Sequence, residues 1–233
     1  MWGSSGKDVW AAGVRCLLVH FDGMRWTLVS HATEGNAGDL CGTTAHDVHG
    51  FDLLDVAGSS VNDVWAVGTG GTFMHWDGRR WRRTPSPTRD AITSVWASGL
   101  DDAWAAAGRR MFHWDGRRWE EAAIVRTAFG KLWGCSARDV WATGGEGEVH
   151  RWDGARWSSV PGPPKTTLTD IRGRAADDVW AVAAGGQAFH FDGRSWTASA
   201  TGTERALAGV WVAPNGDAWS VGERGTILRR RVR

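Results

Sequence analysis

The sequence predicts an all-β protein, a β-propeller of four-stranded antiparallel blades, about six in number. The first observation is a segment of roughly 39 residues that recurs through nearly the whole chain. The second is that each copy holds four short strand signals separated by turn residues. Four short strands at a period near 40 are typical of propeller blades. A right-handed β-solenoid is the rival fold, but its repeats are shorter and seldom contain hairpin turns.

The repeat is measured by the Trp that follows Asp-Val or Asp-Ala, and its last five copies are separated by 39, 37, 39 and 39 residues. The six copies are Trp10, Trp65, Trp104, Trp141, Trp180 and Trp219. The first interval is 55 residues, and it contains Leu40–Phe51, which aligns with Met1–Ala12 and keeps Asp47 in register. We interpret residues 30–52 as an irregular, decayed repeat within a single domain, residues 1–233. Six blades are expected, and seven with one stunted blade is the alternative.

The strands of one complete unit can be assigned in order. In the unit that starts at Ile92 they are Ser94–Ala97, Ala103–Ala106, Arg110–Trp114 and Arg118–Glu121. The turn between the third and fourth strands carries Asp-Gly, as in Asp77-Gly78, which suits the two positive-φ positions of a type I′ turn. The last unit ends after its third strand, Thr226–Arg229, before any Asp-Gly turn. We therefore expect a weakly latched ring in which the terminal blades unfold first, or a chain cut from a longer protein that supplied the missing strand.

The turns of a blade fall into two groups. The turns between the first and second strands and between the third and fourth strands are expected at one end, here called the turn end. The connections between the second and third strands, and those between consecutive blades, are expected at the other end, here called the loop end. The loop end is the usual ligand face of propellers.

Composition excludes several classes of protein. The 233 residues include 23% charged residues and carry a net charge of +1, so neither disorder nor a strong nucleic-acid field is indicated. The basic clusters Arg79–Arg83 and Arg229–Arg231 are interpreted as solvated edges. No apolar run approaches the ~18 residues that would predict membrane insertion. Three cysteines do not predict a disulfide framework, and a single pair is left open.

Localisation is predicted only conditionally. Residues Met1–Lys7 show no basic region followed by an apolar core, so no signal peptide is visible. The expectation is cytoplasmic if the chain is complete. It is extracellular or cell-surface if the N-terminus is truncated, because Trp2 already aligns with the interior of a repeat.

Repeated polar residues are given structural roles. The Asp that precedes Val-Trp or Ala-Trp is expected to cap the amides of the first hairpin; its copies are Asp8, Asp47, Asp63, Asp102, Asp139, Asp178 and Asp217. The recurring His20, His75, His113 and His190 are expected to make a hairpin hydrogen bond or to pack at the rim. His46 and His49 are weak zinc candidates, because their spacing suits one turn of helix. No cofactor is expected.

Catalytic motifs are missing from the sequence. It contains no Gly-x-Ser-x-Gly, His-Glu-x-x-His, phosphate-binding loop or Cys-x-x-Cys. The units resemble the Trp-rich propeller repeats found in tandem in secreted and surface proteins of bacteria, and loosely the Asp-box repeats of sialidase-like proteins. The resemblance implies a propeller and binding outside the cell, and it carries over no catalytic residue. A sialidase-type site would use a Tyr nucleophile, and this chain has no Tyr.

The sequence is therefore interpreted as a non-catalytic binding propeller that recognises a protein or glycan through its loop end. Charged residues that the repeat does not require at that end are the predicted contacts, namely Arg109, Arg110, Glu146, Glu148, Lys165 and Arg224. Two alternatives remain open: a structural repeat fragment of a larger surface protein, and a degenerate glycosidase-like enzyme. No nucleic-acid partner is expected.

Overall fold

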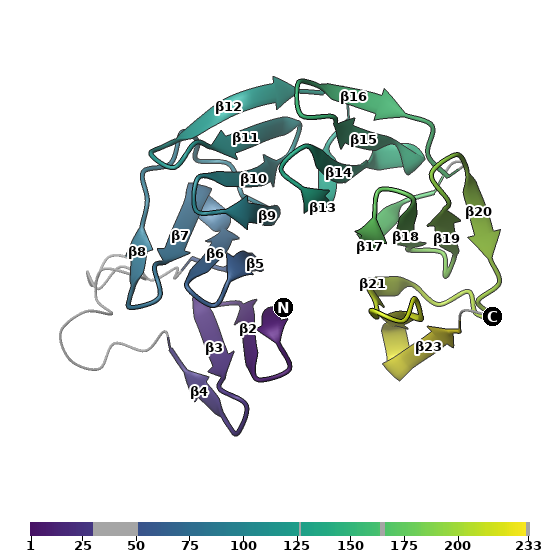
Figure 1. The fold of residues 1–233 in the computed structure, drawn as a ribbon, viewed down its shortest axis with the longest axis horizontal. Coiled ribbons are helices and arrows are strands. Elements are labelled where there is room, and N and C mark those ends of the chain that lie inside the picture. Colours follow the sequence, from purple (N-terminus) through teal and green to yellow (C-terminus); the bar gives the residue numbers. More distant parts are fainter. Residues whose placement is uncertain (30–50, 126, 164–165, 232–233) are drawn as a thin grey trace. The chain divides into compact units, whose positions relative to one another are not determined.

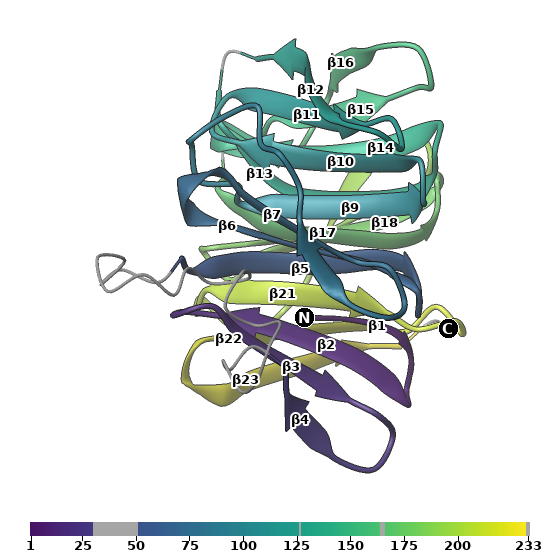
Figure 2. The ribbon, with the colours of Figure 1, turned by 90° about the vertical axis from the view of Figure 1, so that its left-hand side faces the viewer.

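The computed structural model describes residues 1–29, 51–125, 127–163 and 166–231. Within these residues the regular structure consists of β-strands and three one-turn 3₁₀ helices. No helix in this part of the chain is long and apolar enough to cross a membrane. Figures 1 and 2 show the strands of each blade side by side.

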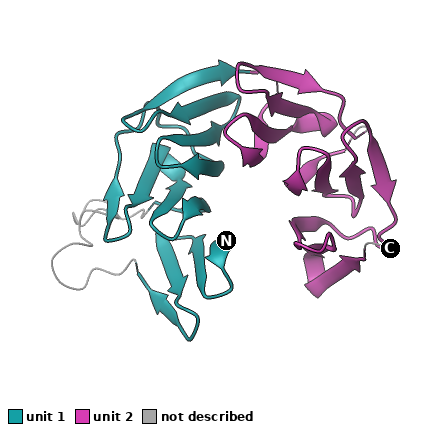
Figure 3. Cartoon of the chain, in the orientation of Figure 1, with its two compact units in different colours: residues 1–124 teal, residues 125–233 magenta. Residues whose placement is uncertain are grey.

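The strands form six antiparallel sheets, each in sequential strand order, which confirms the prediction of an all-β propeller with six blades. The chain divides into two compact units, Met1–Ile124 and Val125–Arg233, each with three blades (Figure 3). That residues 1–233 form one domain stays a prediction. The decayed repeat lies outside the described residues, apart from Phe51 and Asp52.

The first unit holds blades 1 to 3. Blade 1 is β1 (Trp2–Ser5), β2 (Asp8–Gly13), β3 (Leu17–Phe21) and β4 (Trp26–Leu28). Blade 2 is β5 (Leu53–Ser60), β6 (Asp63–Gly68), β7 (Thr72–Trp76) and β8 (Trp81–Arg83), with η1 (Thr69–Gly71) between β6 and β7. Blade 3 is β9 (Ser94–Gly99), β10 (Asp102–Ala107), β11 (Arg110–Trp114) and β12 (Trp119–Ile124).

The second unit holds blades 4 to 6. Blade 4 is β13 (Phe129–Ser136), β14 (Asp139–Gly144), η2 (Gly145–Gly147), β15 (Val149–Trp152) and β16 (Trp157–Val160). Blade 5 is β17 (Leu168–Ala175), β18 (Asp178–Ala183), β19 (Ala188–Phe191) and β20 (Trp196–Ser199). Blade 6 has only three strands, β21 (Leu207–Val212), β22 (Ala218–Gly222) and β23 (Thr226–Arg230), with η3 (Glu223–Gly225) between the last two.

Blades pack on one another through the tryptophans that set the period. Trp65 on β6 is fully buried and makes edge contacts with Trp114 and Trp119 of blade 3, at centroid distances of 5.0 Å. Large flat rings bury much apolar area and favour such edge-to-face contacts. All six residues of β6 are buried, because both faces of this strand are covered.

Buried carboxylates link the innermost strands of neighbouring blades by accepting hydrogen bonds across the interface. Asp55 on β5 accepts hydrogen bonds from the Ser94 hydroxyl at 2.8 Å and from the Val95 amide at 3.2 Å. Asp170 on β17 accepts one from the Val210 amide at 3.0 Å. A buried carboxylate bonded to amides is a strong, charge-assisted contact, so neighbouring innermost strands are held in register.

The Asp-Gly turns differ from the type I′ prediction. Gly78 has a φ of 86°, but Asp77 is not among the residues with positive φ. The Asp77 carboxylate accepts hydrogen bonds from the amides of Arg79 and Arg80, at 3.0 and 2.9 Å. The connection from β7 to β8 is therefore a four-residue loop closed by an Asp side chain, and the backbone hydrogen bonds lower the pKa of Asp77.

Cysteine chemistry differs between two sites. Cys16 is buried and disulfide-bonded, whereas Cys135 is a free thiol. Burial and the hydrogen bond to Asp139 raise the pKa of Cys135 to about 11. Cys41 lies outside the described residues.

Candidate functional site

The two ends of each blade are built as the sequence predicts. At the turn end, a Cβ at Gly78 would lie 2.5 Å from the Asn62 side chain, and one at Gly116 would lie 2.9 Å from Asp101. The turns of both hairpins of a blade therefore meet there, and only glycine allows the close approach. At the loop end, the amide of Glu223 donates to the carbonyl of Ala206 at 2.9 Å. This bond joins an inter-blade connection to the turn between β22 and β23.

The repeated Asp does not cap hairpin amides as predicted. The Asp63 carboxylate is fully buried, with one oxygen accepting from the Ser59 hydroxyl and the other 2.6 Å from His75 Nε2. The His75 ring in turn stacks on Trp65 at 4.2 Å. The Asp63 carboxylate thus links three strands of its blade, since Ser59 lies on β5 and His75 on β7.

The same network recurs with substitutions. Arg151 replaces the His in blade 4 and lies 2.6 Å from Asp139, and Arg229 does so in blade 6, 2.5 Å from Asp217. Cys135 takes the place of the Ser in blade 4. Since either a guanidinium or an imidazole satisfies the carboxylate, the network is structural in all six blades. Burial raises the pKa of Asp178, but bonds from His190 and Arg174 outweigh it and hold this pKa below its usual value.

Two predicted contact residues occupy strained backbone at the loop end. Glu146 in η2 has a φ of 59° and Arg224 in η3 a φ of 55°, whereas the corresponding residue of η1 is Gly70, with a φ of 64°. Left-handed backbone disfavours a side chain with a Cβ by roughly 1 kcal/mol. Both side chains are exposed. Two charged residues therefore stand where glycine would be less strained.

Arg110, another predicted contact, is held by its own blade. Its guanidinium bonds Glu121 on β12 at 2.6 Å, and Thr88 and Asp90 of the preceding connection at 3.1 and 3.2 Å. The hydrogen bond to Glu121, followed by that to Asp90, raises the pKa of Arg110. Arg109 beside it is exposed. Arg110 therefore fastens the loop end of blade 3.

Glu148 is likewise engaged within its blade. Its carboxylate accepts a hydrogen bond from the Thr127 hydroxyl and lies 3.5 Å from Nε2 of the buried His150. That separation is too long for a good hydrogen bond, and His150 Nε2 is buried with no hydrogen-bond partner among the described residues. Burial lowers the pKa of His150, against the opposing effect of Glu148.

Arg224 lines a hollow of about 760 Å³ at the loop end of blade 6. Its walls are the connection Gly202–Arg205, the η3 residues Glu223 and Arg224, and the first residues of β23, Thr226–Leu228. Glu204 and Arg205 were not predicted from the sequence. Both could have been proposed, because both are charged residues in an inter-blade connection. The repeat does not reveal, however, that this connection lies beside the turn between β22 and β23.

Three further residues of the sequence prediction fall in the undescribed segments. Lys165, His46 and His49 lie outside the described residues. Within the residues that the structure describes, no group of three or more His, Cys, Asp or Glu side chains is arranged to hold a metal ion.

Comparison with known proteins supports the fold at low sequence identity. No family model and no curated protein matches the chain. The structure of YCF48 from Cyanidioschyzon merolae matches with a TM-score of 0.69 and 14% identity, over 97% of this chain and 80% of that one. The WD40 β-propeller domain of Doa1 matches with a TM-score of 0.70 and 11% identity, over 95% and 74%. A structure of YCF48 bound to a D1 peptide matches with a TM-score of 0.53 and 13% identity, over 100% and 90%. At these identities the likeness shows the propeller fold alone.

Proposed function

We propose that the chain is a non-catalytic propeller that binds a segment of another protein at the loop end of blade 6. The observation that carries this proposal is the charged Arg224 in left-handed backbone at the wall of the hollow. Local strain persists only where the surrounding structure holds it, and it concentrates at binding sites. Glycine at this position would relieve the strain but would present no charge.

The chemistry of the hollow suits a polypeptide with both signs of charge. Glu204 and Glu223 offer carboxylates, Arg205 and Arg224 offer guanidinium groups, and Ile227 adds an apolar side chain that is 66% exposed. None of the four charged side chains makes an ion pair with another described residue. Charges of both signs around an apolar side chain favour a protein over a glycan, since most sugars are neutral or anionic and offer no cation to the two carboxylates. A propeller of similar fold, YCF48, has been solved with a D1 peptide bound.

The test uses peptides selected from a display library against the full chain. Arg224→Gly is the informative variant, because it removes the guanidinium and relaxes the backbone at once. We expect a selected peptide to bind this variant about tenfold more weakly, a loss of ~1.4 kcal/mol. The free energy of unfolding should rise by up to ~1 kcal/mol. If Arg224 had a purely structural role, the variant would not combine weaker peptide binding with a higher free energy of unfolding.

Arg194→Gly is the matched control. Arg194 lies in the Asp-Gly turn of blade 5, at the turn end, where only its backbone amide bonds Asp192. We expect this variant to bind the selected peptides as the unmodified chain does. Equal binding by Arg224→Gly and by the charge reversal Glu204→Lys would overturn the proposed site. Binding on a glycan array with no peptide selected would overturn the proposed class of partner.

A further inference from the structure

Blade 6 ends in an open strand edge. Its strand order is β21-β22-β23, whereas each of the other five blades has a fourth strand beyond the third. In blade 2 the amide of Thr84 donates to the carbonyl of Phe73 on β7, at 3.0 Å. Ile227 occupies the position of Phe73 in the repeat, as shown by their partners Val221 and Val67 in the preceding strands. The backbone of Ile227 therefore points to the side of β23 where the described residues supply no strand.

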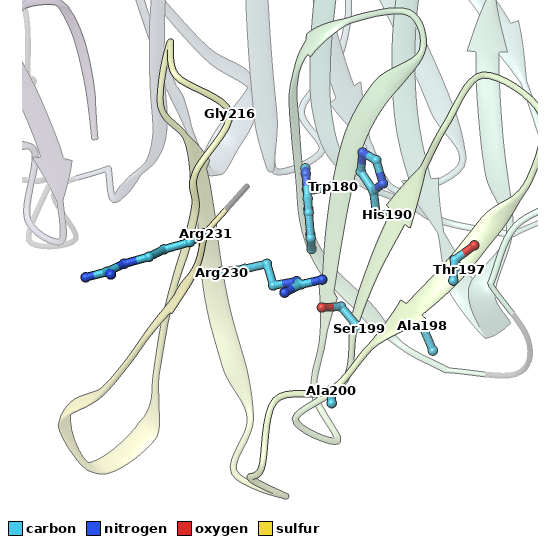
Figure 4. A pocket seen from close by; sticks show the side chains of 9 residues that line it. All are labelled: Trp180, His190, Thr197, Ala198, Ser199, Ala200, Gly216, Arg230 and Arg231. Carbon is cyan, nitrogen blue, oxygen red and sulfur yellow. The ribbon is translucent and has the colours of Figure 1, made fainter. Parts of the chain in front are cut away.

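A groove lies beside this edge. Its volume is about 490 Å³, and it is lined on one side by Trp180, His190 and β20 residues, and on the other by Arg230 and Arg231 (Figure 4). Figure 4 shows Arg230 directed toward Trp180, and Arg231 directed away from it. Arg230 and Leu228 share the face of β23 that packs toward blade 5. Neither arginine forms an ion pair with another described residue, so this edge is basic.

The other blades show which side chain fills such a groove. The first residue of each of the five fourth strands is Trp, and in blades 2, 3 and 5 it packs on the period-marking Trp of the preceding blade. The centroid distances are 5.2 Å for Trp81 on Trp10, 5.0 Å for Trp119 on Trp65 and 6.4 Å for Trp196 on Trp141. Trp180 of blade 5 is the corresponding acceptor for blade 6. Among the described residues no fourth-strand Trp reaches it.

We infer that the edge of β23 binds an extended segment of a separate protein, as an antiparallel fourth strand with an aromatic residue and flanking acidic residues. The aromatic ring enters the groove against Trp180, where Trp81 and Trp119 lie in earlier blades. The acidic residues pair with Arg230 and Arg231, and the backbone hydrogen bonds run along Ile227 and Arg229. Strand addition of this kind takes its affinity from the main chain and its specificity from alternate side chains. This site shares Ile227 with the hollow of the proposed function, but it uses the backbone of that residue and the groove beside Trp180, and the inference does not rest on the proposed function.

The experiment uses a labelled peptide, Gly-Glu-Glu-Trp-Thr-Glu-Ser, titrated with the full chain and followed by fluorescence polarisation. We expect saturable binding. Replacing Trp by Ala in the peptide should weaken it about tenfold or more, because the groove loses its aromatic occupant. Replacing the three Glu by Lys should abolish binding at the same protein concentration. Equal affinity of all three peptides would overturn the inference.

Variants of the chain locate the binding. Ile227→Pro removes an amide donor from an edge where proline is tolerated, and Ile227→Ala is the matched control that keeps the donor. We expect the first to lose peptide binding and the second to retain it within about threefold. Arg230→Glu should weaken binding about tenfold. Arg224→Gly should leave it unchanged, so failure at this edge and failure at the hollow are distinguishable.

The source of the added strand is tested by sedimentation of the chain without peptide. A monomer at the concentrations used for titration is expected. A dimer that the peptide dissociates would assign the edge to a second copy of this chain, and would overturn the inference of a separate protein.

Discussion

Blades 3 and 6 are built from the same repeat, yet their tryptophans are buried to different extents. In blade 3, Trp104 is 2% exposed and stacks near His113. In blade 6, Trp219 at the same position is only half-buried, and Trp211 beside it is 57% exposed. Both blades have the period-marking Trp of the repeat at the same position. Burial of its tryptophans therefore depends on the strands and blades around them rather than on the repeat itself.

The fourth strand also fastens the loop end. Arg110 begins β11 and is held by Glu121 of β12 and by Asp90 of the preceding connection. The corresponding residue of blade 6, Thr226, bonds only the carbonyl of Glu223 in its own turn, at 2.8 Å. Blade 3 thus ties its loops to its fourth strand, whereas Thr226 of blade 6, like Thr72 of blade 2, bonds a carbonyl of its own turn.

The largest expected difference is the cost of truncating the period-marking Trp. We expect Trp104→Ala to lower the free energy of unfolding by ~3–5 kcal/mol, because it empties a fully enclosed site. Trp219→Ala should cost only roughly 1–2 kcal/mol, since its ring is already half in solvent. Urea unfolding followed by circular dichroism measures both. Equal costs would show that Trp219 is enclosed in solution by something beyond the described residues.

Hydrogen exchange compares the same two blades without mutation. Amides from Val95 to Trp114 should exchange with protection close to the global free energy of unfolding. Those from Trp211 to Leu228 should be protected at least ~2 kcal/mol less, because a three-stranded sheet with an open edge unfolds locally. Mass spectrometry of exchanged peptides resolves these segments. Equal protection would refute the weak latch expected from the sequence.

The fold could be predicted from the sequence because turn residues separate the four strands of each repeat. The strand Arg110–Trp114 matches β11 to the residue, and β9 and β10 extend the predicted strands by one or two residues at their ends. The type I′ prediction for Asp77-Gly78 was wrong, since the Asp carboxylate bonds two amides and removes the need for positive φ at Asp77.

The candidate site was predicted less completely, for a physical reason. Arg110 and Arg224 look alike in the sequence, as basic residues near the turn between the second and third strands. Only the structure shows that Glu121 and Asp90 engage Arg110 and that Arg224 and Glu204 line the same hollow. These relations depend on where the inter-blade connections run, and those connections lack the repeat. The network partners of Asp63 were predictable in principle, since Ser59 and His75 recur at fixed offsets from it.

A pH-dependent contrast is expected between His150 of blade 4 and Leu228, its counterpart in blade 6. The folded-state pKa of His150 is lowered by burial, so its contribution to stability is present above the unfolded pKa near 6.5 and is lost as the pH falls toward the folded value. His150→Leu copies blade 6 and should remove this loss, a gain of about 1 kcal/mol at pH 5. Urea midpoints at pH 5 and pH 8 measure it. His150→Gln, which stays polar but does not titrate, should also abolish the pH dependence. If the pH dependence of stability persisted in both variants, a group other than His150 would be the one that titrates.

The smallest expected effect concerns the fastening of the loop end. Arg110→Thr gives blade 3 the residue that blade 6 has at the same position, and it removes the contacts to Glu121, Thr88 and Asp90 together. The pairs are half-exposed, so the free energy of unfolding should fall by only ~0.5–1 kcal/mol. The local effect should be clearer, because the connection before β9 loses its anchor and the amide of Asp90 should exchange faster. Arg117→Thr is the control, since Arg117 lies at the turn end and bonds Asp115 only through its amide. If the amide of Asp90 kept its protection in Arg110→Thr, backbone packing would be what orders the loop end of blade 3. The difference from blade 6 would then be due to the missing fourth strand alone.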